Sequence, residues 1–217
     1  MGGWRATASA AQFIPPHPTL SVLRQAVQGC RGCELYRYAN QAVFGEGPRT
    51  ARLMFVGEQP GDQEDRAGHP FVGPAGKVLD AAFAAAGIDR RKVYLTNIVK
   101  HFKFVRRELT KRRLHKPPAL TEVRACQPWL REEIRLVKPE IVIALGSTAA
   151  KGLLGSDFSV TRDRGKPFRS EWAGTVLPTV HPSSVLRAPT GAGRERAREE
   201  FFADIRRLAV LLRSKAS

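Results

Sequence analysis

The chain has 217 residues, a length that allows one domain with a sizeable hydrophobic core. Its 36 Lys and Arg residues exceed its 20 Asp and Glu residues, giving a formal net charge of +16, so we expect a polyanionic partner such as nucleic acid. No apolar run approaches the roughly 20 residues that span a bilayer, and the N-terminus has no apolar stretch typical of a signal peptide, so we expect no membrane partner. We expect a cytoplasmic, monomeric protein.

Strands and helices are expected to alternate along the chain. After an extended N-terminal arm at 1–18, apolar residues at helical spacing begin near Thr19. Strands are expected at 52–57, 93–99, 140–146 and 175–182. The first three are nearly continuous apolar runs, as parallel strands buried on both faces require. Helices are expected at 75–87, 120–137, 147–155 and about 194–213. This order predicts an α/β fold, with one domain at 19–217 built as three layers, α/β/α, around a short, mainly parallel four-stranded sheet.

Polar residues accompany each of the four expected strands. Glu58 follows the first strand, Asn97 lies in the second, a Gly-Ser-Thr sequence follows the third, and His181 ends the fourth. Open α/β sheets bind ligands outside the carboxyl ends of their strands. The sequence therefore predicts a site at one edge of the sheet, supplied by four separate strands.

The loop after the first strand is rich in glycine and proline and reads GEQPGDQEDRAGHPFVGPAG. It is neither a Walker A loop nor a G-x-G-x-x-G loop. One interpretation is a solvated turn whose glycines serve only backbone geometry. The other is a pocket wall that brings the carboxylates of Asp62 and Asp65 near the chemistry and offers Phe71 as a stacking platform.

Three cysteines suggest a metal site. Cys30 and Cys33 form a C-x2-C pair, Cys126 lies far downstream, and His101 is the expected fourth ligand. Three cysteines and one histidine suit tetrahedral zinc as well as an iron–sulfur cluster, and buried inert thiols are the alternative. The residue types do not separate these possibilities.

A basic loop is expected at 102–118. Seven Lys or Arg residues and one acidic residue lie within 103–116, and such a loop is typical of sequence-independent phosphate contacts. The cations expected to contact DNA are Lys111, Arg112 and Arg113. Neighbouring positive charge disfavours protonation of His115 and would keep its imidazole neutral, as a nucleophile or base must be. The alternative is that His115 only accompanies a DNA-binding loop.

The sequence HPSSVLR at 181–187 places a histidine, two hydroxyls and an apolar residue on one turn. It reads either as a plain helix entry capped by a serine, or as a DNA contact. In the second interpretation the serines hold a phosphate, the leucine enters the base stack and His181 faces the pocket. The expected DNA contacts here are Ser183, Ser184, Leu186 and Arg187.

Taken in order, four motifs resemble those of the uracil-DNA glycosylase superfamily: GEQPGDQED, PFVGPAG, TNIVK and HPSSVLR. The resemblance covers about residues 20–210 and is strongest to the iron–sulfur family 4 group. Two features differ from that group, because His101 replaces its usual cysteine and a basic insertion ends in KRRLH. Both features, with Gln59 after Glu58, resemble the UdgX subgroup, which becomes covalently joined to uracil-containing DNA.

The resemblance implies a cofactor and roles for individual residues. It implies a structural [4Fe–4S] cluster, with the ligands Cys30, Cys33, His101 and Cys126. It also implies that Phe71 stacks on a flipped uracil, that Asn97 reads the uracil edge, and that His181 donates a hydrogen bond to uracil O2. The residues expected on the sugar side and in its supporting loop are Glu58, Gln59, Asp62 and Asp65.

The function expected from these features is uracil excision from single- or double-stranded DNA, followed by covalent attachment of the deoxyribose C1′ to His115. The catalytic residues would be His115, Glu58 and His181, acting in a single turnover. One alternative is a conventional family 4 enzyme, in which water takes the sugar. The other is a non-catalytic nucleic-acid-binding protein on the same fold.

Overall fold

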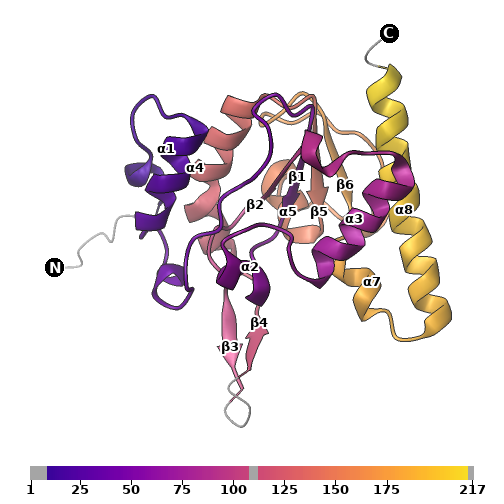
Figure 1. The fold of residues 1–217 in the computed structure, drawn as a ribbon, viewed down its shortest axis with the longest axis horizontal. Coiled ribbons are helices and arrows are strands. Elements are labelled where there is room, and N and C mark those ends of the chain that lie inside the picture. Colours follow the sequence, from indigo (N-terminus) through magenta and orange to yellow (C-terminus); the bar gives the residue numbers. More distant parts are fainter. Residues whose placement is uncertain (1–8, 108–111, 215–217) are drawn as a thin grey trace.

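The computed structural model describes residues 9–107 and 112–214 (Figure 1), so Lys111 of the expected DNA-binding set lies outside these ranges. In the described chain, a parallel sheet has the strand order β2-β1-β5-β6. Its strands are β1 (Leu53–Gly57), β2 (Val93–Asn97), β5 (Ile141–Leu145) and β6 (Val176–Thr179). The four expected strands are confirmed, each shorter than expected.

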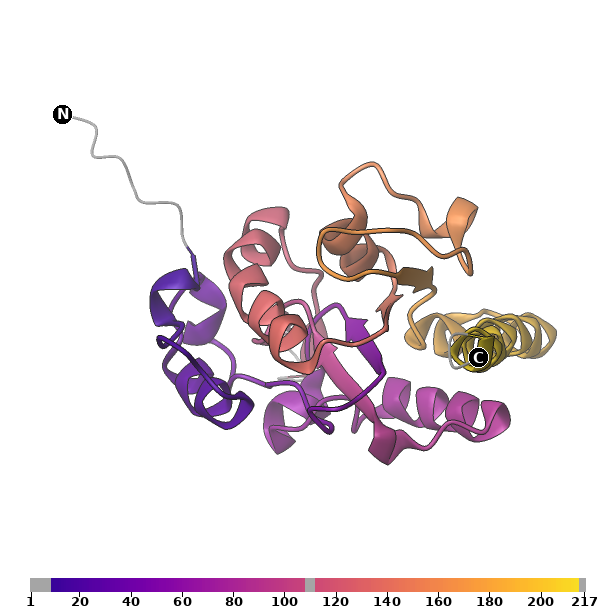
Figure 2. The same ribbon diagram turned by 90° about the horizontal axis from the view of Figure 1, so that it is seen from above.

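Alternate residues of the strands face two hydrophobic cores. In β1, Met54 and Val56 belong to one core, whereas Leu53 and Phe55 belong to the other. The first core is covered by α1 (Leu20–Ala26), α4 (Leu120–Val137) and α5 (Ser147–Leu154). The second is covered by α3 (Pro74–Ala86), α7 (Ser183–Arg187) and α8 (Gly191–Ser214). Seen from above, α4 and α8 lie on opposite sides of the sheet (Figure 2), which confirms the three-layer fold.

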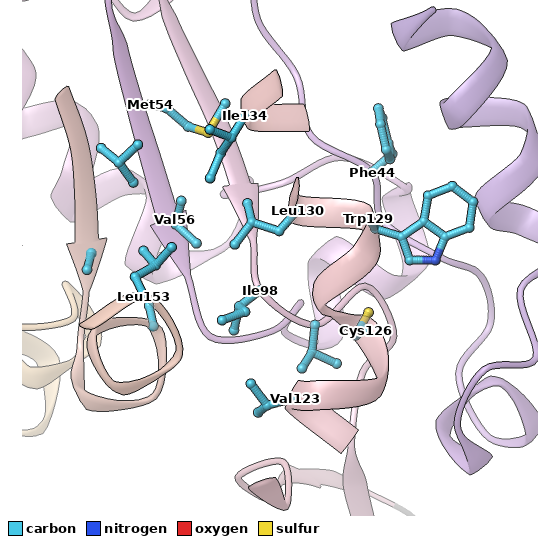
Figure 3. Close-up of a cluster of buried hydrophobic side chains, with 14 of the residues drawn as sticks. Phe44, Met54, Val56, Ile98, Val123, Cys126, Trp129, Leu130, Ile134 and Leu153 are labelled. Atoms are coloured by element: carbon cyan, nitrogen blue, oxygen red, sulfur yellow. The ribbon is translucent and has the colours of Figure 1, made fainter. Parts of the chain in front are cut away.

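Local sequence features explain the bounds of helices α1, α3 and α4. The Thr19 hydroxyl accepts a hydrogen bond from the backbone N–H of Val22 at the start of α1. Helix α3 has Pro74 in its first turn and Gly87 in the left-handed conformation after its last residue. Helix α4 matches its expected bounds because its apolar residues recur at helical spacing, with Leu130 and Ile134 toward the sheet and Trp129 on another side (Figure 3).

Two expected loops contain regular structure. The loop after β1 includes α2 (Asp62–Ala67). The basic loop is a β-hairpin of β3 (Phe104–Arg106) and β4 (Arg113–His115), in which Phe104 pairs with His115. Figure 1 shows this hairpin extending beyond the sheet, at the same end as α2 and α7. The remaining short elements are the helix α6 (Val160–Asp163) and the 3-10 turns η1 (Ala11–Phe13), η2 (Val27–Gly29), η3 (Glu34–Arg37) and η4 (Arg90–Lys92).

The N-terminal segment is not simply extended. Its described part contains η1, and the backbone N–H of the buried Ala10 donates to the carbonyl of Ala125 in α4 at 2.8 Å. This segment therefore packs on α4. Over the described ranges, no helix combines the length and apolarity required to cross a bilayer.

Candidate active site

The carboxyl ends of the strands bring the expected polar residues to one edge. Glu58 follows β1, Asn97 ends β2 and His181 follows β6. The hairpin brings His115 to the same edge, because its Nε2 atom lies 3.2 Å from Oε1 of Glu58. Groups far apart in the sequence thus meet where open α/β sheets bind ligands.

Glu58 uses its two carboxylate oxygens for different partners. Oε1 faces His115, and Oε2 accepts a hydrogen bond from the hydroxyl of Thr148 in α5. Burial raises the pKa of Glu58, but the hydrogen bonds with His115 and Thr148 outweigh burial, so its pKa lies below the ordinary value. Glu58 is therefore a carboxylate at neutral pH. Sequence reasoning noted the Gly-Ser-Thr motif but did not identify Thr148.

His181 is a neutral imidazole whose geometry favours one tautomer. Burial lowers its pKa to about 4. Its Nδ1 atom accepts from the backbone N–H of Ser183 at 3.2 Å and lies 2.7 Å from the hydroxyl of the same residue. Because Nδ1 accepts, the proton is assigned to Nε2, which leaves an N–H donor for a ligand.

Asn97 and Phe71 form a wall next to His181. Both side chains are buried, and the Phe71 and His181 rings are inclined by 27° with centroids 6.3 Å apart. Gly57 makes room for this arrangement, since a Cβ atom there would lie 2.3 Å from Oδ1 of Asn97 and 2.8 Å from Cζ of Phe71. Phe71 has a φ of 56°, and Arg90 donates to its carbonyl at 3.2 Å. The backbone therefore holds the Phe71 ring at a defined place.

Gln59, which was expected on the sugar side, binds the backbone of the hairpin through its side-chain amide. Its Oε1 accepts from the backbone N–H of Lys103 at 3.1 Å. Its Nε2 donates to the carbonyls of Lys103 at 3.2 Å and Lys116 at 3.0 Å. The amide thus joins both ends of the hairpin, and it does so because these ends leave backbone groups that need partners.

Arg113 was expected to contact DNA, but in the structure its side chain points into the protein and pairs with α2. Its guanidinium is ion-paired with Asp62 at 2.5 Å and Asp65 at 2.6 Å, and its side chain is only 8% exposed. It also lies over the rings of Phe102 and Phe104, with 5.4 and 5.0 Å from Cζ to the ring centroids. The arginine is turned inward because two carboxylates of α2 and two rings surround it.

This arrangement also changes the expected surroundings of His115. The sequence suggested that flanking cations, including Arg113, set its charge state. In the structure Arg113 is neutralised by α2, and the charged group that contacts the imidazole is the Glu58 carboxylate. Asp62, expected to bind substrate and to support its loop, pairs with Arg66 and Arg113, and its contact with substrate stays a prediction.

The other described residues that were expected to contact DNA are at least partly exposed. Arg112, Leu186 and Arg187 are exposed, and Leu186 is 41% exposed. Ser184 is partly exposed, whereas the Ser183 hydroxyl is engaged by His181 and by Arg187 at 2.8 Å. DNA contact by these residues remains a prediction.

The four expected metal ligands lie near α4. Trp129 donates to the Cys30 sulfur at 3.2 Å, and the backbone N–H of Lys100 donates to the Cys126 sulfur at 3.3 Å. Burial raises the pKa of Cys126 to about 12, with smaller effects from its neighbours that include the other two cysteines. Burial also raises the pKa of Cys33 and lowers that of His101 to about 4.

The side chains of the four expected ligands do not form a complete coordination shell. In the described part of the chain, no group of three or more His, Cys, Asp or Glu side chains is arranged to hold a metal ion. The donor chemistry nevertheless fits a cluster, since a buried thiolate needs a compensating cation and N–H groups already point at two of the sulfurs.

The buried ion pair of Lys100 and Glu133 lies between the expected metal ligands and the edge site. Lys100 and Glu133 are both 0% exposed, and their Nζ and Oε2 atoms lie 2.5 Å apart. Lys100 also donates to the Asn97 carbonyl at 2.8 Å, while Glu133 accepts from Gly45 and Tyr94. Sequence reasoning missed the pair, although Glu133 falls within the apolar stripe of α4.

Comparisons with known proteins show which family the chain belongs to. The sequence pattern that defines the Uracil DNA glycosylase superfamily matches residues 44–206. The type-4 uracil-DNA glycosylase of Sulfurisphaera tokodaii is 35% identical over 200 residues, which cover 88% of this chain and 86% of the relative. The type-4 enzyme of Thermotoga maritima is 36% identical over 171 residues, 77% of this chain and 83% of the relative. The type-4 enzyme of Archaeoglobus fulgidus is 31% identical over 204 residues, 91% of this chain and 95% of the relative.

The family match spans the sheet and the whole edge site, from β1 to α8. The relatives are matched along most of their own length as well. The chain therefore belongs to the uracil-DNA glycosylase superfamily.

Proposed function

We propose that this protein binds uracil-containing DNA, excises the uracil and then stays attached to the deoxyribose through His115. Family membership supports the excision step. The observation that carries the attachment step is the contact between His115 and Glu58 at the edge where Asn97 and His181 also lie. The substrate is reached by flipping the nucleotide out of the base stack.

The base-recognition half of the site consists of Phe71, Asn97 and His181. Phe71 stacks on the flipped uracil, and the Asn97 amide offers both a donor and an acceptor to the uracil edge. As the bond between N1 and C1′ breaks, uracil leaves with the electron pair. The Nε2–H of the neutral His181 donates to O2, where the departing base gathers negative charge.

The sugar-capture half of the site consists of His115 and Glu58. Cleavage leaves cationic character at C1′, and a lone pair of the imidazole forms the new bond to that carbon. The N–H proton of the ring passes to the Glu58 carboxylate, so the substituted imidazole ends neutral. The hairpin that carries His115 is held by Gln59 and Arg113, which supports a nucleophile kept in place.

Conventional turnover is the second candidate. The relatives named type-4 uracil-DNA glycosylases favour it. In this case Glu58 would orient a water molecule toward C1′, and His115, whose side chain is 48% exposed, would contact DNA. An abasic site in DNA that is free of protein, formed with repeated turnover, would distinguish it from capture.

We also propose a [4Fe–4S] cluster held by Cys30, Cys33, His101 and Cys126. The cluster would join the segment between η2 and η3, the loop after β2, and α4, and would contribute to the fold rather than to bond cleavage. Iron and sulfide analysis of the purified protein tests it, with four irons per chain expected for this cluster type. Cys126→Ala should bleach the visible absorption and lower the unfolding temperature. A colourless, iron-free protein that is stable and active would overturn the assignment.

The capture step is tested with a uracil-containing oligonucleotide. Wild-type protein should give a one-to-one species that survives boiling in SDS, and a thymine oligonucleotide should give none. His115→Ser should abolish this species, whereas His17→Ser, which changes an exposed histidine of the N-terminal segment, should not. Catalytic release of uracil without any heat-stable species in the wild type would leave conventional turnover as the function.

A further inference from the structure

The two carboxylate oxygens of Glu58 have different partners, and the one that does not face His115 is held by Thr148. The Thr148 hydroxyl donates to Oε2, so that Oε1 is the oxygen left to face the imidazole. The other titratable group that acts on Glu58 electrostatically is His181. Thr148 contacts neither His115 nor His181 through a hydrogen bond in the described structure, so its effect on the site passes through Glu58.

The chain places Thr148 there by a tight turn after β5. Gly146 has a φ of 90°, a conformation that side chains rarely adopt, and its N–H donates to the Thr179 carbonyl at 2.8 Å. A Cβ atom on Gly146 would lie 3.0 Å from Cβ of His181. This close approach places the start of α5 next to His181, and Thr148 is the second residue of the helix.

A fixed hydroxyl has two physical effects on a carboxylate. It restrains rotation of the carboxylate plane, which otherwise has broad torsional freedom, and so fixes where the second oxygen points. It also favours the charged form, together with the positive end of α5. The β-branched side chain of threonine is itself restricted in rotation, so the hydroxyl is a firm anchor.

We propose that Thr148 is a positioning residue for the reaction, whose hydroxyl holds one oxygen of Glu58 so that the other oxygen faces His115. This inference rests on the proposed role of Glu58, but it does not require that His115 captures the sugar. An oriented carboxylate serves His115 in capture and a water molecule in conventional turnover.

The test compares Thr148→Val, which removes the hydroxyl at similar size, with Thr148→Ser, which keeps it. Ser147→Ala is the matched control, because Ser147 is the neighbouring exposed residue at the start of α5. Single-turnover uracil loss is measured at saturating protein, together with affinity for uracil-containing DNA and the unfolding temperature. Total uracil loss is counted whether the sugar ends on protein or on water.

Thr148→Val should slow uracil loss about tenfold while DNA affinity and unfolding temperature stay as in the wild type. Thr148→Ser and Ser147→Ala should both react like the wild type. The proposal is overturned if the valine variant reacts at the wild-type rate, if the serine variant is as slow as the valine variant, or if affinity falls by the same factor as the rate. A missing heat-stable adduct in the wild type would end the capture proposal, yet the uracil-loss rates would still decide the role of Thr148.

Discussion

His115 and Glu58 face each other at the edge of the sheet, with Nε2 of the imidazole 3.2 Å from Oε1 of the carboxylate. They reach this contact from different elements, since Glu58 follows β1 and His115 ends β4. A carboxylate beside the ring can orient it and accept its proton, whereas a surrounding group of cations could do neither. The pair therefore provides the proton acceptor that the proposed capture by His115 requires.

Glu58→Gln should slow formation of the heat-stable adduct by about a hundredfold, because an amide cannot accept the ring proton. Time courses on denaturing gels measure this rate. Glu46→Gln is the matched control, since Glu46 also contacts a histidine, His69, at 2.6 Å. Equal adduct rates in the wild type and Glu58→Gln would show that Glu58 takes no part in capture.

Asn97→Ala should abolish uracil excision while leaving affinity for uracil-free DNA largely unchanged. The buried amide of Asn97 reads the base, whereas cations on the protein surface supply most of the general affinity. Fluorescence anisotropy with matched uracil and thymine oligonucleotides measures both affinities. A similar loss of binding to both would contradict the assignment of Asn97 to base recognition.

Arg113→Lys separates a role within the hairpin from a role in DNA binding. Lysine keeps the charge but cannot make the same forked contacts with Asp62 and Asp65, so we expect a lower adduct yield. Arg112→Lys, at the exposed neighbouring residue, should leave the yield unchanged. If Arg113→Lys forms the adduct as well as the wild type, positive charge alone is what position 113 supplies.

Glu133→Ala should lower the free energy of unfolding by about 3–5 kcal/mol, because it leaves the Lys100 ammonium buried without its counter-charge. Glu132→Ala, at the partly exposed neighbouring residue that pairs with Arg135, should cost less than about 1 kcal/mol. Urea unfolding compares the two. Similar midpoints for both variants would mean that the buried pair adds nothing to stability.

The partly buried His181 should make the protein less stable in mild acid. Its pKa falls from 6.5 to about 4 on folding, so between these values the unfolded chain binds a proton that the folded chain does not. Stability should therefore decrease as pH falls from about 6.5 toward 4, and His181→Asn should remove that part of the decrease. Urea midpoints at pH 7 and pH 5 test this. An equal difference between the two pH values in both proteins would argue against it.

The sheet and its edge could be predicted because they depend on local pattern. Continuous apolar runs identify buried parallel strands, and parallel strands bring their carboxyl ends together wherever the connections run. The bounds of α4 were predicted for the same reason, since its apolar residues recur at helical spacing. These features need no knowledge of which side chains meet.

The roles of Gln59, Arg113 and Thr148 could not be predicted because they depend on long-range contacts. A run of cations does not reveal which member turns inward, and the strands of the hairpin are too short to leave a pattern of alternation. The resemblance implied that Gln59 lines the sugar side, and it gave no sign that the Gln59 amide also binds the backbone of the hairpin. Only the folded structure shows which polar groups are already satisfied.

The hairpin leaves and rejoins the body at one point, where the N–H of Lys116 donates to the carbonyl of Lys103 at 3.0 Å. Strand β2 ends before this point and α4 begins after it, so neither is interrupted. In evolutionary terms, such a segment can be gained, lengthened or lost in one genetic step without disturbing the sheet. If His115 captures the sugar as proposed, one insertion and the few substitutions that hold it in place are enough to add a nucleophile to a pocket that already excises uracil.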